Sequence, residues 1–138
     1  ANASYMYTNV QLPEGGAYTN AQRSLQGASP YLVNADISYA PKFKNDTQLT
    51  ATLLYNLQGP RIHAVGISGL GDVKQEDLHT LDFVATYKLN DHWNFKLQMT
   101  DLLNQDIVFK QEVKDGRKLE VERYGRGTTF ELGFSYTL

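Results

Sequence analysis

The chain of 138 residues carries 13 Lys and Arg against 15 Asp and Glu, a formal net charge of -2, and no cysteine. Its length fits a single domain, and its charge lacks the basic excess typical of nucleic-acid-binding proteins. A chain without cysteine excludes disulfide scaffolds, thiolate metal sites and cysteine nucleophiles. No apolar run approaches the ~18 residues that a membrane-spanning helix needs. A membrane protein of this composition would cross with strands, in which only alternate residues need be apolar.

Apolar residues recur with a period of two along most of the chain, which predicts strands and not helices. In the clearest segment, 128–138, Phe130 and Leu132 fall on one face while Glu131 and Gly133 fall on the other. The expected strands, in chain order, span residues 3–10, 30–40, 47–58, 80–89, 93–113 and 117–138. The pattern therefore predicts an all-β fold, an antiparallel meander of about six strands.

The connections between these strands alternate in length. Segments 41–46 and 90–92 are short, whereas 11–29, 59–79 and 104–125 are long. Because antiparallel neighbours place every second connection at the same end, the long loops should share one end of the sheet. Short turns opposite long loops are typical of outer-membrane barrels.

Aromatic residues on the apolar face form two expected belts. One belt, near the short turns, contains Tyr39, Tyr87, Trp93, Phe95 and Tyr136; the other contains Tyr31, Tyr55, Phe83 and Phe130. Two such belts favour a lipid-facing band with an aromatic girdle at each interface. Alternation alone leaves a soluble sandwich or a lipocalin-like barrel open, because an inside-out pattern looks the same in sequence.

Several segments, taken together in order and spacing, resemble the C-terminal part of a TonB-dependent outer-membrane receptor. They are RSLQGASPYLVNAD at 23–36, ATLLYN at 51–56, GPRI at 59–62, Leu81-Asp82, DLLN at 101–104, and YGRGTTF at 124–130 with the closing Tyr136-Thr137-Leu138. Asp101 stands where the family usually has Asn, and Leu138 stands where its last strand commonly ends in Phe. The match covers about residues 23 to 138.

The resemblance implies a barrel of about 22 strands, a plug domain, and an N-terminal box that contacts TonB. Residues 1–138 would then be a C-terminal segment of a large transmembrane β-barrel, with the plug and the earlier strands absent. Six strands also fall below the ~8-strand minimum of a closed membrane barrel. The expected function is TonB-dependent uptake of a scarce solute, such as a metal chelate, across the outer membrane of a Gram-negative bacterium.

The expected partners follow from the same resemblance. They are outer-membrane lipid, the plug, the small-molecule solute, and the TonB complex through the missing N-terminal part, with no nucleic acid. An isolated fragment should self-associate, because an open sheet with unpaired edges and an apolar face is not stable alone in water or in lipid. Two alternatives stay open: a soluble β-sheet module that binds a lipophilic ligand, and a passive porin-like barrel.

Chemical motifs are sparse, and we expect no enzyme, no cofactor and no catalytic or metal site; substrate-binding residues cannot be named. The long loop 59–79 holds His63, Asp72, Glu76, Asp77 and His79, but their spacing matches no standard zinc or calcium pattern. Gly66, Gly69 and Gly71 lack the preceding strand and following helix of a phosphate loop, so they indicate a flexible loop. His92 beside Asp91 is expected to be a solvated turn residue.

The other face of the strands is polar. In a barrel it would line the interior and contact the plug, whereas in a half-buried sheet it would simply be solvated. Its members are Asn34, Asp36, Gln48, Thr50, Thr52, Asp82, Thr86, Lys88, Lys96, Gln98, Thr100 and Glu131.

Asp115-Gly116 predicts a two-residue type I′ turn in the last hairpin, because such a turn needs positive φ at both central positions. Lys114 would then face Arg117, and paired residue numbers would sum to 231 along an unbroken ladder without a bulge. Trp93 would face Leu138. An odd sum puts the apolar residues of both strands on one face, whereas a slip of one residue would invert a strand.

Overall fold

The computed structural model describes residues 1–13, 16–43, 47–113 and 115–138. These residues form strands and no helix, and hence no helix able to cross a membrane. The strands are β1 (Asn2–Tyr5), β2 (Val10–Gln11), β3 (Gln22–Arg23), β4 (Tyr31–Tyr39), β5 (Gln48–Gln58), β6 (Arg61–Ala64), β7 (Val73–Gln75), β8 (Leu78–Lys88), β9 (Trp93–Thr100), β10 (Ile107–Glu112), β11 (Lys118–Tyr124) and β12 (Thr129–Tyr136).

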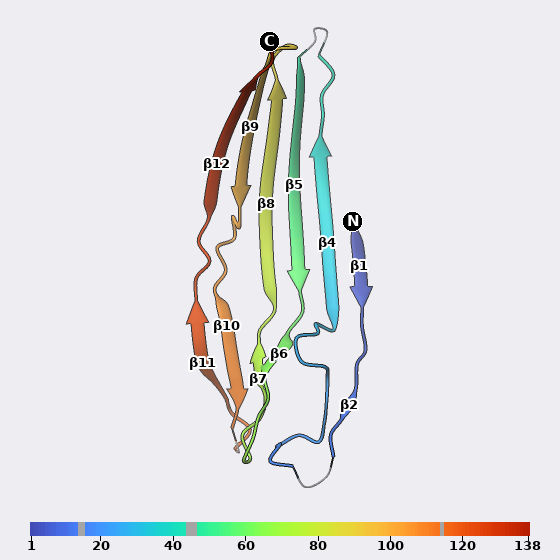
Figure 1. Ribbon diagram of the computed structural model, residues 1–138, viewed down its shortest axis with the longest axis vertical. Helices are drawn as coiled ribbons and strands as arrows, with labels where there is room; N and C mark the ends of the chain where they lie inside the picture. Colours follow the sequence, from blue (N-terminus) through green and yellow to red (C-terminus); the bar gives the residue numbers. More distant parts are fainter. Residues whose placement is uncertain (14–15, 44–46, 114) are drawn as a thin grey trace.

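Six strands form one antiparallel sheet in the order β1-β4-β5-β8-β9-β12, which confirms the predicted meander. The short connections join β4 to β5 and β8 to β9 at one end of this sheet, and the three long ones start from the other end (Figure 1). We call that second end the loop end. No closed barrel is formed by the described strands, because β1 and β12 are the two edges of the sheet.

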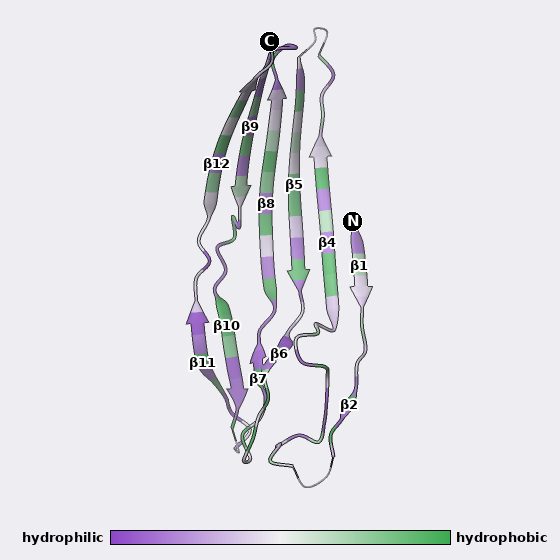
Figure 2. Cartoon of the chain, in the orientation of Figure 1, coloured by the Kyte–Doolittle hydropathy of each residue, from purple (hydrophilic) through white to green (hydrophobic). Residues whose placement is uncertain are grey.

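The register places the predicted apolar residues of every strand on one face. Leu53 pairs with Ile37 on one side and with Phe83 on the other, and Phe83 pairs with Met99. The last strand joins the same face, since Met99 pairs with Phe130. Hydrophobic and hydrophilic residues accordingly alternate along the strands in Figure 2. The predicted separation into an apolar and a polar face is confirmed.

The long loops contain strands that periodicity did not predict. In segment 59–79, β6 and β7 form a hairpin, and β7 pairs with β10, so that β11-β10-β7-β6 is a second sheet at the loop end (Figure 1). The expected strand 3–10 is shorter, with a separate β2–β3 pair beyond it. The unpredicted strands β2, β3, β6 and β7 are two to four residues long, which is too short for a period-two signal.

The last hairpin exists, but its predicted register is wrong. The Val113 N–H donates to the Arg117 carbonyl and the Gly116 N–H donates to the Val113 carbonyl, so the sum at the turn is 230 and the loop has three residues. Only Gly116 has positive φ (80°) there among the described residues, which suits a three-residue loop ending in a glycine bulge. The predicted partner of Arg117, Lys114, lies outside the described residues.

Two irregularities change the register further along the hairpin. A bulge between Phe109 and Lys110 raises the sum to 231, and the ladder then stops at 101–106 and 125–128. In β9–β12 the sum is 229, so Trp93 faces Tyr136 instead of Leu138. The sum is still odd, which is why the predicted sharing of one apolar face holds although the pairs themselves differ.

The interruption coincides with the DLLN segment. Asp101 and Asn104 have positive φ (57° and 45°), and the Asn104 N–H donates to the Asp101 carbonyl across a tight turn. The facing chain is fixed to this turn, because the Gly127 N–H donates to Asn104 Oδ1 and the Thr128 hydroxyl to the Asp101 carbonyl. The turn therefore separates the six-stranded sheet from the hairpin of β10 and β11, which we call the outer hairpin.

Packing differs between the two parts of the molecule. Ile62 and Phe109, the buried hydrophobic side chains among the described residues, both belong to the loop-end sheet. In contrast, Leu132, Phe134 and Ile37 of the six-stranded sheet are 85%, 76% and 73% exposed. The six-stranded sheet is a single layer with no second layer packed on its apolar face within the described chain.

Candidate functional site

Three long segments meet at the loop end and enclose two adjoining recesses. The first long loop is fixed to the β6–β7 connection, since Tyr18 pairs with Ile67 and the Thr19 N–H donates to the Gly66 carbonyl. The arginine recess, about 330 Å³, lies between this loop and β6; it is lined by Arg23, Arg61, Lys74 and Asp72, among others. The hairpin recess, about 340 Å³, lies between the same loop and the two hairpins.

Asp72 lies between the two recesses and holds the first loop in place. Its carboxylate is almost completely buried, with Oδ1 accepting from the Gly66 N–H at 2.8 Å and Oδ2 accepting from Asn20 Nδ2 at 3.3 Å. The Arg23 guanidinium is 3.7 Å away and balances its charge. A buried carboxylate is stable only when it is hydrogen-bonded and paired, and Asp72 meets both conditions.

Arg23 is buried without hydrogen bonds from its side chain to the described residues. Its side chain is 11% exposed, and it lies between Asp72 and the ring of Tyr18, whose centroid is 5.4 Å from the guanidinium carbon. Its Nη1 is fully buried and has no acceptor in the described part of the chain. Unsatisfied guanidinium donors are costly, so Nη1 of Arg23 is a buried donor without an acceptor beside the arginine recess.

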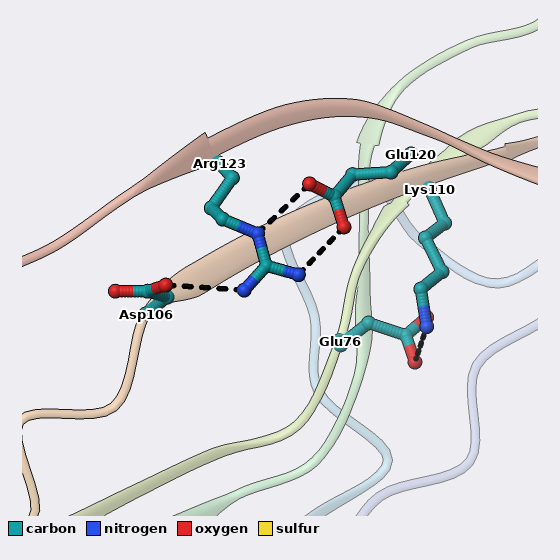
Figure 3. A network of polar contacts seen from close by, with 5 residues as sticks. All are labelled: Glu76, Asp106, Lys110, Glu120 and Arg123. Atoms are coloured by element: carbon teal, nitrogen blue, oxygen red, sulfur yellow. Dashed lines mark hydrogen bonds and ion pairs between the residues drawn. The ribbon is translucent and has the colours of Figure 1, made fainter.

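Charged side chains of the outer hairpin form a second network (Figure 3). Arg123 donates to both carboxylate oxygens of Glu120, at 2.8 and 2.7 Å, and to Asp106 at 3.1 Å, while Lys110 pairs with Glu76 at 3.2 Å. Arg123 and Glu120 are three residues apart, a spacing that puts two side chains on opposite faces of a regular strand. The extra residue of the bulge opposite Phe109 and Lys110 brings them to the same face. The Arg123 guanidinium lowers the pKa of Glu120, and the two carboxylates raise the pKa of Arg123.

The acidic and histidine residues of loop 59–79 do not form one site. His79 bonds Tyr55 through Nδ1 (2.6 Å) and Asp77 through Nε2 (3.0 Å). His63 packs on Phe109, with 4.6 Å between ring centroids, whereas Asp72 and Glu76 bind Arg23 and Lys110 as described. No group of three potential metal ligands occurs among the described residues.

The glycines of the same loop shape the β6–β7 connection. A Cβ on Gly66 would lie 2.2 Å from the Leu70 carbonyl oxygen, so the chain can pass there only with glycine. The Gly69 N–H donates to the Thr19 hydroxyl and the Gly71 N–H to the Glu112 carbonyl. These N–H groups are therefore used within the chain and do not form a phosphate cradle.

His92 and Asp91 occupy the exposed short turn, as expected, but both have partners. His92 Nδ1 lies 2.8 Å from the Thr137 carbonyl oxygen. Asp91 accepts from Lys88 at 2.8 Å, and this hydrogen bond lowers the pKa of Asp91. His92 also accepts from the Thr137 N–H through its carbonyl, so His92 fastens the segment after β12 to the turn.

The polar face of the six-stranded sheet carries cross-strand hydrogen bonds. Asn34 donates to Asn2 (2.8 Å), Ser38 and Thr52 share a hydrogen bond (2.9 Å), and the Asn56 amide donates to Thr80 (3.2 Å). Arg126, from the interruption before β12, lies over this face beside Asn34 and 3.5 Å from the buried carboxylate of Asp101.

Sequence reasoning missed Arg23, Arg61, Lys74 and Arg126 as members of polar sites. The only signal for three of them, Arg23, Arg61 and Arg126, was their place within the resemblance segments at 23–36, 59–62 and 124–130. Comparison with known proteins adds no assignment: no family model, curated protein or solved structure matches the chain.

Proposed function

We propose that the chain is the C-terminal section of the barrel of a TonB-dependent receptor in the outer membrane of a Gram-negative bacterium. The receptor takes up a scarce solute, such as a metal chelate. The observation that carries this proposal is the shared register of six strands, which gathers their large apolar side chains on one exposed face. The order and spacing of the segments that resemble such receptors support the same reading.

The exposed apolar face suits lipid better than water. Soluble monomers rarely expose apolar patches beyond a few hundred Å², and here each of the six strands contributes exposed large hydrophobic residues. Near the short turns, Trp93 packs against Tyr136 with ring centroids 4.8 Å apart and stacks on Phe95 at 6.1 Å. An aromatic cluster at one end of an apolar band is typical of a membrane interface.

The sheet edges require further strands. The free edges of β1 and β12 present backbone groups that lipid cannot satisfy, and in the proposal the remaining barrel strands pair with them. The polar face then lines the interior, next to the plug and the solute path, and TonB contacts the N-terminal part of the receptor. The isolated chain should self-associate; a stable monomer by analytical ultracentrifugation without detergent would contradict this.

Epitope exposure in cells tests the orientation. An epitope at Asp115, in the turn of the outer hairpin, should bind antibody on intact cells that make the complete protein. The same epitope at Asn90, in a short turn, should bind only after the outer membrane is opened, which makes it the matched control. Both epitopes in the soluble fraction would favour a soluble module that binds a lipophilic ligand and would overturn the proposal.

Energy coupling is tested separately from location. Uptake of the solute should stop when TonB is deleted or the proton gradient is collapsed. Uptake that continues unchanged in both cases would indicate a passive porin-like barrel, as would a gene without a plug-encoding region upstream of this chain.

A further inference from the structure

We propose that the arginine recess binds the anionic group of a small solute, a carboxylate or a phosphate. The biological role of this site rests on the proposed function, because the loop end is where a solute would arrive from outside. Its chemistry rests on the recess itself, whose side chains come from the first loop, β6 and β7.

The recess carries an excess of positive charge. Arg23, Arg61 and Lys74 line it together with a single carboxylate, that of Asp72. Because both oxygens of Asp72 already accept hydrogen bonds and Arg23 balances its charge, the charges of Arg61 and Lys74 are left uncompensated. A metal cation would meet net repulsion there, whereas an anion would be attracted.

The donors of the recess also lack acceptors. Arg61 Nε donates to Gln75 Oε1 at 3.0 Å. When the Gln58 amide is turned so that its oxygen and nitrogen exchange places, the oxygen accepts from Arg61 Nη1 at 3.1 Å. Neither Arg61 Nη2 nor the Lys74 ammonium has an acceptor among the described residues, and the buried Nη1 of Arg23 lacks one too. An oxyanion in the recess would supply acceptors to Arg61 Nη2 and to the Lys74 ammonium at once, in charge-assisted hydrogen bonds.

The size of the recess fits a small solute. About 330 Å³ lies within the usual range of ligand cavities, roughly 300–1,000 Å³. Asp72 and its partners fix the Arg23 side chain before any ligand arrives, so little side-chain entropy would be lost on binding. The recess is therefore preorganised for an anion.

Calorimetric titration of the complete protein in zwitterionic detergent micelles, with inorganic phosphate and with citrate, tests the proposal. Arg23→Gln and Lys74→Gln should each weaken binding about tenfold or more, since each removes a charged hydrogen-bond donor. Lys96→Gln is the matched control: it removes the same charge from the polar face of β9, outside the recess, and should change the affinity less than about twofold. Circular dichroism reports whether each variant folds, and Lys74→Gln keeps the test valid if Arg23→Gln does not fold.

Three results would overturn the proposal. One is no saturable binding of either anion, and another is equal affinity in the parent, Lys74→Gln and the control. The third is binding of dodecyl phosphate micelles alone, which would make the recess a site for a lipid headgroup instead of a solute. The titration needs no membrane insertion and the epitope test needs no ligand, so failure of this site and failure of the proposed function can be told apart.

Discussion

The six-stranded sheet and the loop end are held together in different ways. In the sheet, long antiparallel ladders order the chain while the large apolar side chains stay exposed. At the loop end, short strands are held by buried Phe109 and Ile62, by the buried carboxylate of Asp72, and by ion pairs. The difference teaches that the loop end finds its packing partners within the chain, whereas the apolar face of the sheet has none among the described residues.

The largest effect that separates the two regions is expected at Phe109. Phe109→Ala removes a ring that is 3% exposed and should cost about 3–5 kcal/mol, because a buried aromatic leaves a cavity. Native-state hydrogen exchange should show this loss in β10, β11 and β7, with β5 and β8 unchanged. Leu119→Ala, at a residue that is 45% exposed, is the control; equal loss of protection in β5 and β8 would show that the two regions unfold as one.

Substitutions of two adjacent leucines on opposite faces of β5 test which face of the sheet is apolar. Leu53 faces Phe83 on the apolar side, so Leu53→Lys should destabilise the protein in lipid by about 2–4 kcal/mol, as charges do near the bilayer midplane. Leu54 lies between Asp36 and Asp82 on the polar side, so Leu54→Lys should be neutral or stabilising. Equal denaturation midpoints for the two variants would contradict the assignment of the faces.

A smaller effect is expected at Asp72. Asp72→Asn places an amide nitrogen next to the Asn20 or Gly66 donor and leaves Arg23 without its counter-charge, at a cost of about 1–3 kcal/mol. Faster exchange of the Gly66 amide hydrogen is the measurement. Asp77→Asn, at an exposed carboxylate of the same loop, should leave this exchange rate unchanged; an unchanged Gly66 rate in Asp72→Asn would contradict the role of Asp72.

The smallest effect concerns the exposed pair of Glu120 and Arg123. Because Arg123 lowers the pKa of Glu120, the pair contributes stability above the ordinary value of 4.5 and loses it as the pH falls below that value. Arg123→Gln should raise the pKa of Glu120 toward 4.5, which carbon NMR of the carboxyl group can follow. Lys118→Gln removes a charge from the same strand and should leave the titration of Glu120 nearly as it is; no rise in Arg123→Gln would refute the pairing.

The sequence was sufficient to predict the six-stranded sheet because the physical rule is local. A period of two assigns each residue to a face, and Leu53, Phe83 and Phe130 could be assigned without knowing their partners. That paired residue numbers in the last hairpin have an odd sum was predicted for the same reason. Its pairs were not, because they depend on the three-residue loop after Val113, on the bulge at Phe109/Lys110 and on the turn at Asp101, which a repeating pattern does not encode.

The candidate site could not be predicted from the sequence. Arg23 and Asp72 are far apart in the chain and meet where the first loop pairs with the β6–β7 connection, at Tyr18 and Ile67. The acidic and histidine residues that stood out in loop 59–79 instead point to different partners. Proximity in sequence was a poor guide here, because His63 lies in β6, Asp72 and Glu76 flank β7, and His79 lies in β8, so the chain turns between them.

Cysteine scanning along β5 tests most directly the claim that one face of the sheet meets lipid. The chain has no cysteine, so a spin label at each residue from 49 to 57 of the complete protein in bilayers reports on one position at a time. The account predicts that labels at odd positions meet dissolved oxygen in lipid, while those at even positions meet a water-soluble nickel complex. Accessibility without a period of two, or nickel access at the odd positions, would contradict it.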